Sequence, residues 1–250
     1  MSIRAIIPAA GKGTRLHTGE NDAPKVMRIC GGKPLLETVL GSVSFIEPEN
    51  TYIVVGYKKD QVIEYFGPSY NYVEQKEQLG TGHACMVCAD SFKDFDGTVL
   101  VTFGDMPLFR ADDMKEMCRI HEERKASCTL MTADNPDLSL WARIIRGEDG
   151  RFKAIVEGKD CTEEQAKVTE LFAGVLVFDS KALFETLPLI RTANVQHEYY
   201  LTEVPEIMVE RGLKVETYHI KDGNDLRGVN TPEDLILCEE ELLRREHAHN

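Results

Sequence analysis

The sequence predicts an α/β fold in which a mostly parallel sheet is flanked by helices. Short, nearly continuous apolar runs at 3–8, 52–55 and 98–103 have the length of strands that are buried on both faces. Segments with helical character near 58–66 and 112–124 come between or after these runs. This β-α-β order favours parallel pairing with right-handed crossovers. A glycine-rich turn directly after the first run indicates a ligand site at the end of that strand.

The turn after the first run, residues 9–16, has the composition of a phosphate-binding loop. Gly11 and Gly13 lack side chains that would block a ligand, and they permit positive φ, so that backbone N–H groups can point at phosphate oxygens. Lys12 and Arg15 add positive charge there. The ending of a Walker loop and the third glycine of a dinucleotide fingerprint are both missing. A tight turn without a ligand is the alternative for this stretch alone.

The composition restricts the class of partner. At 250 residues the chain can form one large domain or two small ones, and its 42% apolar content can fill a core. The net charge of −13 argues against a nucleic acid or an anionic membrane as partner, since both need a basic face. A phosphorylated small substrate needs only a local cluster of basic groups and a metal ion.

The cysteine usage fits a cytoplasmic protein. Seven cysteines, an odd number, are scattered along the chain, as expected for reduced thiols. We interpret Cys85 and Cys88 as small core residues on a helix, because neither a second pair nor matched histidines accompany them. The sequence contains no signal peptide, no lipidation motif and no apolar run of 18 residues, so we expect no membrane association.

Two further strands end in residues that suit a nucleotide. Gln75 closes a strand near 71–75, and its amide offers a donor and an acceptor side by side, as the edge of a nucleobase requires. Gly80 and Thr81 then supply backbone N–H groups at a helix start, with helix capping as the alternative reason for them. Asp105 follows the run at 98–103, where a carboxylate could hold a hard metal ion beside phosphates. A turn-forming aspartate is the alternative there.

The second half of the chain predicts a smaller lobe laid over the sheet, from about 127 to 213. Glu157 and Lys159 lie at the end of one of its strands, and we expect the lobe to hold the second substrate. A helix near 200–211 and a strand near 214–219 return the chain to the core. The lobe is predicted to contain strands near 127–133, 143–147, 152–157 and 171–178, with a hairpin connection at 147–150.

The C-terminal segment predicts a capped helix over about 231–247. Thr231 suits the N-cap and Pro232 suits the first helical position. Glu240 with Arg244 and Glu241 with Arg245 are spaced for i,i+4 ion pairs, and we expect the charged face of this helix to be solvated. No serine or cysteine has a recognisable base around it, so the sequence gives no support for nucleophilic catalysis.

Taken together, these segments resemble the nucleotidyltransferases that activate sugar 1-phosphates, most closely the uridylyltransferase domain of bacterial N-acetylglucosamine-1-phosphate uridylyltransferases. That family opens with a strand and Leu-Ala-Ala-Gly-x-Gly-Thr-Arg-Met, followed by Pro-Lys. Here Pro8–Leu16 follow that pattern, and Pro24 and Lys25 come after a longer loop. Five later motifs match in order, from about residue 3 to 235: Gln75 with Gln78–Ala84, Gly104–Leu108, Val156–Asp160, Glu198–Thr202 and Gly228–Asn230.

The resemblance implies a role for each matching position. Arg15, Lys25 and Asp105 would be catalytic, and Asp105 and Asn230 would hold Mg²⁺, the implied cofactor. The implied nucleotide-binding residues are Ala9, Ala10, Gly11, Lys12, Gly13, Thr14, Arg15, Lys25, Gln75, Gly80 and Thr81. The implied acceptor-binding residues are Ala142, Glu157, Lys159, Phe172 and Tyr200.

Two positions depart from the family pattern, and both belong to the sugar site. The family's Gly-Tyr-Gly-Arg is Leu140–Arg143 here, which puts Ala142 where the second glycine lines the sugar site. The family's sugar-binding asparagine falls on Phe172, whose side chain cannot hydrogen-bond a hydroxyl or an N-acetyl group. The nucleotide half is therefore better supported than the identity of the sugar.

The resemblance implies a Mg²⁺-dependent nucleotidyltransferase that joins UTP and a sugar 1-phosphate, N-acetylglucosamine 1-phosphate in the family, to give a UDP-sugar and pyrophosphate. The alternatives are CTP or another triphosphate, a different phosphorylated acceptor, and a non-catalytic nucleotide sensor. The intact metal and phosphate residues argue against the sensor. We expect small-molecule partners, with neither nucleic acid nor membrane, and no acetyltransferase activity, because no hexapeptide-repeat domain follows.

The implied architecture is a single nucleotidyltransferase domain with the Rossmann-like fold of nucleotide-diphospho-sugar transferases. Its nucleotide-binding half would comprise about 1–125 and 214–235, and its acceptor-binding lobe about 127–213. The last helix would span about 231–247.

Overall fold

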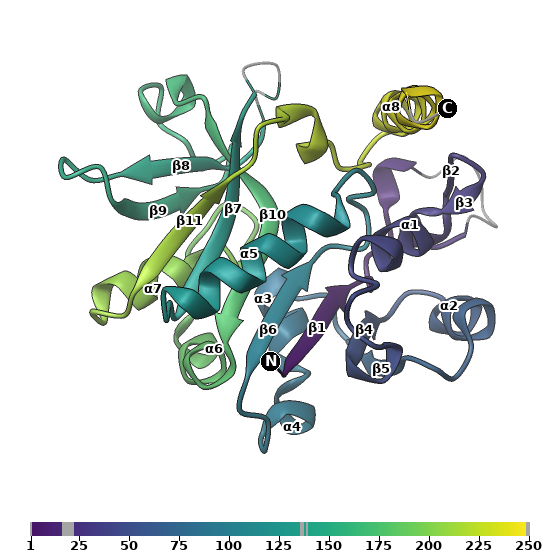
Figure 1. Ribbon diagram of the computed structural model, residues 1–250, viewed down its shortest axis with the longest axis horizontal. Coiled ribbons are helices and arrows are strands. Elements are labelled where there is room, and N and C mark those ends of the chain that lie inside the picture. Colours follow the sequence, from purple (N-terminus) through teal and green to yellow (C-terminus); the bar gives the residue numbers. More distant parts are fainter. Residues whose placement is uncertain (1, 17–22, 136–137, 139, 249–250) are drawn as a thin grey trace.

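The computed structural model describes residues 2–16, 23–135, 138 and 140–248. The longer loop that precedes Pro24 and Lys25 includes residues 17–22, which lie outside this range. A central sheet carries the fold, with the strand order β11-β7-β10-β6-β1-β4-β5 and a β8–β9 hairpin attached beside β10 (Figure 1). The strands are β1 Ile3–Pro8, β4 Thr51–Val55, β5 Asn71–Glu74, β6 Thr98–Thr102, β7 Cys128–Asp134, β8 Arg143–Arg146, β9 Phe152–Val156, β10 Glu170–Asp179 and β11 Val215–His219.

The predicted mostly parallel sheet is confirmed, and β10 is the main exception to parallel pairing. β1 pairs in parallel with β4 and β6, β4 pairs in parallel with β5, and β7 pairs in parallel with β11. β10 runs antiparallel between β6 and β7 and so joins the two halves of the sheet. The carboxyl ends of β1, β5 and β6 consequently open at one edge.

Helices cover both faces of the sheet, which explains why its strands read as continuous apolar runs. Successive residues of β1 point to opposite sides, with Ala5 and Ile7 in one core cluster and Ile6 in the other. One face packs against α1 Leu35–Ser42, α2 Lys59–Phe66 and α5 Ala111–Glu123. The other face packs against α3 Thr81–Met86, α4 Ala89–Phe92, α6 Ser180–Thr186 and α7 Glu203–Glu210 (Figure 1).

A bulge in β10 brings that strand against the loop after β6. The register with β7 shifts between Phe172 and Leu176, and Gly174 within the shift has φ +74°. A Cβ atom on Gly174 would collide with the sulfur of Met106. Glycine is therefore required here both for its backbone conformation and for the close approach.

The last helix, α8 Pro232–Ala248, lies beside a small hairpin formed by β2 Ile29–Cys30 and β3 Lys33–Pro34 (Figure 1). Its predicted cap is confirmed, because the Asp234 N–H donates to Thr231 Oγ1 at 3.2 Å and Asp234 Oδ2 accepts from the Thr231 N–H at 2.9 Å. The Gly31 N–H donates to Glu239 Oε1 at 3.2 Å, which ties the hairpin to the helix. Within the described part of the chain, each helix is too short or too polar to cross a bilayer.

Candidate active site

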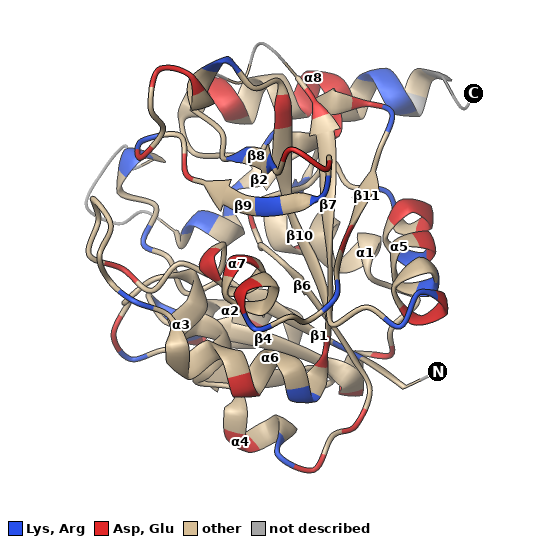
Figure 2. Cartoon of the chain, turned by 90° about the vertical axis from the view of Figure 1, so that its left-hand side faces the viewer, with Lys and Arg blue, Asp and Glu red and all other residues tan. Residues whose placement is uncertain are grey.

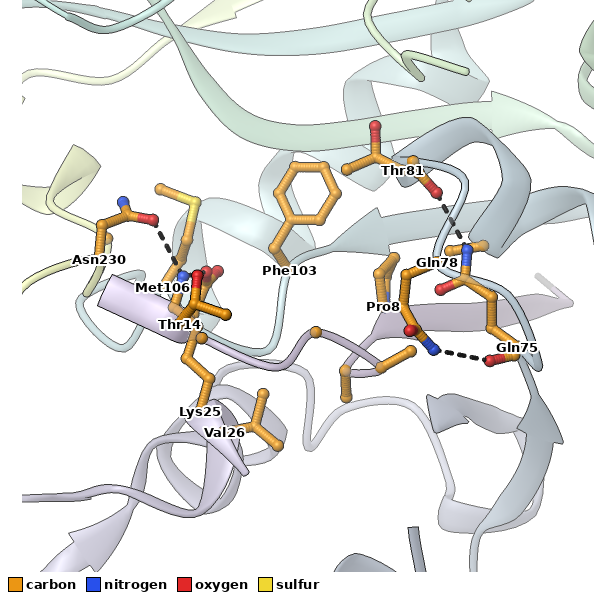
Figure 3. Close-up of a pocket in the computed structure, with 18 of the residues that line it drawn as sticks. Pro8, Thr14, Lys25, Val26, Gln75, Gln78, Thr81, Phe103, Met106 and Asn230 are labelled. Carbon is orange, nitrogen blue, oxygen red and sulfur yellow. Dashed lines mark hydrogen bonds and ion pairs between the residues drawn. The ribbon is translucent and has the colours of Figure 1, made fainter. Parts of the chain in front are cut away.

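A cleft of about 460 Å³ opens at the carboxyl ends of β1, β5 and β6. Parallel strands of α/β sheets present ligand sites at this edge. Figure 3 shows Lys25 and Asn230 at one end of the cleft and Gln75, Gln78 and Thr81 at the other, with Phe103 between them. The lining residues are Pro8, Ala9, Ala10, Gly11, Gly13, Thr14, Arg15, Lys25, Val26, Gln75, Gln78, Gly80, Thr81, Ala84, Phe103, Asp105, Met106, Trp141, Glu198, Gly228 and Asn230.

The glycine-rich loop is held close to Lys25. Gly13 has φ +65°, and a Cβ atom there would lie 2.6 Å from the Cβ atom of Lys25. At Gly11, by contrast, a Cβ atom would meet nothing within 4 Å. Glycine is thus required at position 13 by the positive φ and by the close packing against Lys25, whereas Gly11 leaves open space inside the cleft.

Gln75 forms the opposite end, and its side chain is nearly buried, with 4% exposed. Its Nε2 donates to the Gly80 carbonyl at 3.1 Å and lies 3.0 Å from His83 Nδ1. Because a carbonyl oxygen can only accept, the bond to Gly80 fixes which end of the amide is nitrogen. The donor end of Gln75 is therefore engaged by the protein.

The segment at 198–202 fastens this end of the cleft from the other half of the chain. The Gly82 N–H donates to the Tyr199 carbonyl at 2.7 Å, and the Leu201 N–H donates to Thr81 Oγ1 at 3.0 Å. A Cβ atom on Gly80, whose φ is +112°, would lie 2.6 Å from the Tyr199 carbonyl oxygen. Gly80 therefore permits the contact between the two segments.

At the other end, Asp105 and Asn230 lie on two loops that are joined by a backbone hydrogen bond from the Val229 N–H to the Asp105 carbonyl at 2.9 Å. Lys25 Nζ forms an ion pair with Asp105 and donates to Asn230 Oδ1 at 3.0 Å. Arg15 Nη2 also donates to Asn230 Oδ1, at 3.1 Å. Two side-chain oxygens from loops far apart in the sequence thus converge on positive charge.

This pair of oxygens fits a hard divalent cation. A carboxylate and an amide carbonyl are the donor types that Mg²⁺ prefers, and a cationic ammonium group already lies against both. Among the described residues, no three His, Cys, Asp or Glu side chains gather as a metal site. An ion held here would complete its coordination with substrate phosphates and water, as Mg²⁺ commonly does.

The structure brings together the predicted nucleotide and metal residues, with Lys12 as the one that does not line the cleft. The predicted acceptor residues lie elsewhere. Phe172 is 5% exposed in the core, and its N–H donates to the Ala142 carbonyl at 2.9 Å. Lys159 is exposed. Glu157 and Tyr200 line a separate cavity of about 170 Å³.

The pKa values of Glu157 and Tyr200, the two predicted residues that line the smaller cavity, are both raised. Thr202 Oγ1 donates to Glu157 Oε1 at 2.9 Å, and desolvation raises the pKa of the Glu157 carboxyl above its usual range despite that bond. The Tyr200 hydroxyl donates to Gln196 Oε1 at 3.0 Å. Desolvation, reinforced by Asp160 and Glu157, raises the pKa of Tyr200 to about 12.

Nine lining residues were not predicted as site residues, and three of them, Phe103, Met106 and Trp141, bring large apolar side chains to the cleft. The other six are Pro8, Val26, Gln78, Ala84, Glu198 and Gly228. A Cβ atom on Gly228 would lie 3.7 Å from Trp141 Cζ2 and 3.4 Å from Met106 Cγ, so the indole lies over Gly228 near the Asp105–Asn230 pair. Trp141 occupies the tyrosine position of the family's Gly-Tyr-Gly-Arg, and Phe103 and Met106 flank Gly104 and Asp105. The motif residues next to Phe103, Met106 and Trp141 were the signal in the sequence that could have indicated these three side chains as part of the site.

The fold and this cleft, with two cationic side chains beside a carboxylate–amide pair, are those of a nucleotidyltransferase. The chain belongs to the family of MobA-like NTP transferase domains, whose model matches residues 5–189. It is 41% identical over 245 residues to the bifunctional protein GlmU of Streptococcus uberis, covering 98% of this chain and 53% of that protein. It is 40% identical over 250 residues to GlmU of Streptococcus mutans, covering 100% of this chain and 54% of that protein.

The chain thus spans about half the length of the curated relatives that it matches. A solved structure of UDP-glucose pyrophosphorylase complexed with UDP-glucose superposes with a TM-score of 0.81 at 20% identity, covering 98% of this chain and 100% of that one. The apo form of UDP-glucose pyrophosphorylase gives a TM-score of 0.80 at 19% identity, with the same coverage. At these identities the likeness confirms the fold.

Proposed function

We propose that this chain is a Mg²⁺-dependent nucleotidyltransferase that joins UTP and a sugar 1-phosphate to give a UDP-sugar and pyrophosphate. The observation that carries the proposal is the convergence of Lys25 and Arg15 on the Asp105–Asn230 pair, in the same cleft as Gln75. N-acetylglucosamine 1-phosphate is the first acceptor to test, because the sequence resembles the uridylyltransferases that use it.

The orientation of Gln75 supports uracil as the base. Its nitrogen is engaged by Gly80 and His83, so the amide presents its oxygen as the remaining hydrogen-bonding group. Uracil carries an N3–H donor that such an oxygen can accept, whereas N3 of cytosine is an acceptor. UTP is therefore favoured over CTP.

The chemistry needs no nucleophilic side chain. A phosphate monoester, whose second pKa is near 6, is mostly a dianion at pH 7 and can attack without a general base. Its oxygen forms a bond to the α-phosphorus while the bond from that phosphorus to the bridging oxygen of the β-phosphate breaks, and pyrophosphate leaves with the electron pair. The obstacle is the approach of two anions. Lys25 and Arg15 lower it by offering fixed positive charge where the phosphates meet.

Asp105 and Asn230 would hold the Mg²⁺ ion, which supplies further neutralisation of phosphate charge when it is bound. The loops that carry them are fixed to one another by the bond from Val229 to Asp105. The protein's own contribution is thus to orient the triphosphate and the acceptor phosphate.

A different phosphorylated acceptor is the second candidate, and the acceptor side of the site favours it. Phe172 and Ala142 stand in the core, and Glu157 is engaged by Thr202 in a separate cavity. The wall beside the metal pair is instead formed by Phe103, Met106 and Trp141. These side chains give an acceptor apolar contact rather than hydroxyl recognition.

The test is Mg²⁺-dependent release of pyrophosphate from UTP, CTP, GTP, ATP and dTTP, each paired with a panel of sugar 1-phosphates and other phosphomonoesters. Turnover confined to UTP with N-acetylglucosamine 1-phosphate would support the first acceptor. Turnover of UTP with another acceptor only would support the second candidate. Tight UTP binding without turnover for any pair would indicate a nucleotide sensor and overturn the enzyme proposal.

A further inference from the structure

The charged face of α8 is partly buried, contrary to the solvated face expected from its sequence. Both acidic and basic residues occur along this helix (Figure 2). Arg245 is only 16% exposed, and it contacts Asp225, which is 2% exposed. We call Arg110, Asp225, Glu241 and Arg245 the Arg245 cluster.

Arg245 uses its whole guanidinium group in this cluster. Its Nε donates to Glu241 Oε1 at 2.7 Å, its Nη1 donates to the Leu108 carbonyl at 2.6 Å, and its Nη2 pairs with Asp225 Oδ1. Arg110 adds a second cation to Asp225, with 3.4 Å between Nε and Oδ2. The planar fork of arginine is the feature that allows three acceptors to be held at once.

Two of the three acceptors of Arg245, Leu108 and Asp225, belong to the two segments that carry the metal pair. Leu108 lies three residues after Asp105, on the loop that follows β6. Asp225 lies in the short helix η6 Gly223–Leu226, five residues before Asn230. Arg245 therefore bonds at one point to the segments on which Asp105 and Asn230 stand.

The start of the same helix fixes Asn230 directly. Asp234 Oδ2 accepts from the N–H groups of Asn230 and Thr231, each at 2.9 Å. Arg245 follows about three turns further along α8. One rigid helix thus holds the backbone of Asn230 at its first turn and the loop of Asp105 near its end.

We propose that Arg245 is a positioning residue for the divalent cation, a proposal that rests on the function proposed above. Mg²⁺ accepts little deviation from its octahedral geometry, so its affinity depends on the spacing between the Asp105 carboxylate and the Asn230 carbonyl. Groups that orient metal ligands from outside the first coordination sphere change affinity by about 10–100-fold when they are removed. Arg245 acts on the site through the two loops and touches no substrate.

The variant Arg245→Met keeps the aliphatic stem and removes the guanidinium. Arg244→Met is the matched control. Arg244 bonds the same Glu241, at 2.8 Å and 2.7 Å, and not the predicted Glu240, and its side chain is 62% exposed. Binding of Mn²⁺ in the presence of UTP, measured by electron paramagnetic resonance, reports the metal site without turnover. Urea unfolding of each variant separates a loss of folded protein from a change in the folded protein.

We expect Arg245→Met to weaken Mn²⁺ binding about tenfold or more, and Arg244→Met to leave it within about twofold. Arg245→Lys, which keeps the charge but not the fork, should fall between the wild type and Arg245→Met and serves if the methionine variant does not fold. A variant that loses stability while its folded fraction binds Mn²⁺ like the wild type would overturn the positioning role. If the wild type itself neither binds Mn²⁺ with UTP nor releases pyrophosphate, the proposed function fails, and the positioning role fails with it.

Discussion

Lys25 Nζ lies 3.0 Å from Asn230 Oδ1, and the same ammonium group pairs with Asp105. The lysine thus occupies the point on which the two proposed metal oxygens converge. A divalent cation that binds there must compete with this ammonium group. The triphosphate can relieve that competition, because its oxygens offer Lys25 another anionic partner.

Replacing Lys25 with methionine is expected to have opposite effects on turnover and on metal binding. Pyrophosphate release should fall about 100-fold or more, the usual loss when a preorganised electrostatic group is removed. Binding of Mn²⁺ to the protein without nucleotide should become tighter, because the competing charge is gone. Lys33→Met is the control, since Lys33 is exposed and forms an i,i+4 pair with Glu37. Unchanged Mn²⁺ binding in Lys25→Met would refute the competition.

Alanine at Gly13 should cost more folding stability than alanine at Gly11. Gly13 has φ +65° and no room for a Cβ atom beside Lys25, whereas a Cβ atom at Gly11 meets nothing within 4 Å. We expect Gly13→Ala to lower the free energy of unfolding by about 1–2 kcal/mol. Gly11→Ala should unfold like the wild type in urea yet bind UTP more weakly, because its methyl group enters the cleft. Equal stability of the two variants would contradict the conclusion that the fold requires glycine at position 13 but not at position 11.

The raised pKa of Glu157 predicts a pH-dependent stability difference. The folded protein holds the Glu157 proton more tightly than the unfolded chain, so ionising this carboxyl destabilises the fold as the pH rises above the usual glutamate range. Glu157→Gln keeps an acceptor for Thr202 and has no charge. Its unfolding free energy relative to the wild type should therefore increase between about pH 4 and pH 7. Glu163→Gln, at an exposed position, should show no such trend.

Trp141 should affect the binding of the acceptor and not the binding of the nucleotide. Trp141 Cζ2 and Met106 Cγ both lie within 4 Å of the position that a Cβ atom on Gly228 would take. Figure 3 shows Met106 at the Asn230 end of the cleft, opposite Gln75. Trp141→Ala is expected to raise the acceptor KM about tenfold or more while the UTP KM stays within about twofold. Trp141 is the chain's single tryptophan, so acceptor binding to the wild type can also be followed by its fluorescence. An equal rise in the acceptor KM and the UTP KM would contradict the prediction that Trp141 contacts the acceptor alone.

Restoring the family asparagine at Phe172 should fail to restore a sugar site. Phe172 is packed in the core, and an amide there would lose apolar contact and bury polar atoms. We expect Phe172→Asn to lose about 3 kcal/mol or more of unfolding free energy, with no new turnover of N-acetylglucosamine 1-phosphate. Phe172→Leu, which stays apolar, should lose less. New turnover in the asparagine variant would show that position 172 reaches the acceptor.

The sequence was most informative where a strand ends and a polar loop begins. Gly13, Gln75 and Asp105 follow three strands whose pairing is parallel, and parallel strands place their carboxyl ends together. Asn230 could be predicted only through the family motif, since no local pattern links it to Asp105. The convergence of these residues in one cleft therefore follows largely from topology.

The roles of Arg245 and Trp141 could not be read from the sequence for physical reasons. Glu241 and Arg245 show the same i,i+4 spacing whether the pair faces solvent or a buried carboxylate, and Asp225 is distant in the chain. Trp141 looks like a conservative change from tyrosine. Its contact with Gly228 depends on how the loop before β8 packs against the segment after η6. The positions of Arg245 and Trp141 both depend on tertiary packing, which a local sequence pattern does not predict.

The contacts of α8 also set an order in time. The end of the cleft around Gln75 is complete once the chain extends to Leu201, whose N–H bonds Thr81. The loop after Asp105 is bonded at Leu108 by Arg245, which lies further along the chain and is synthesised after Leu201. During synthesis, the residues that complete the Gln75 end of the cleft therefore leave the ribosome before the arginine that bonds the loop of Asp105.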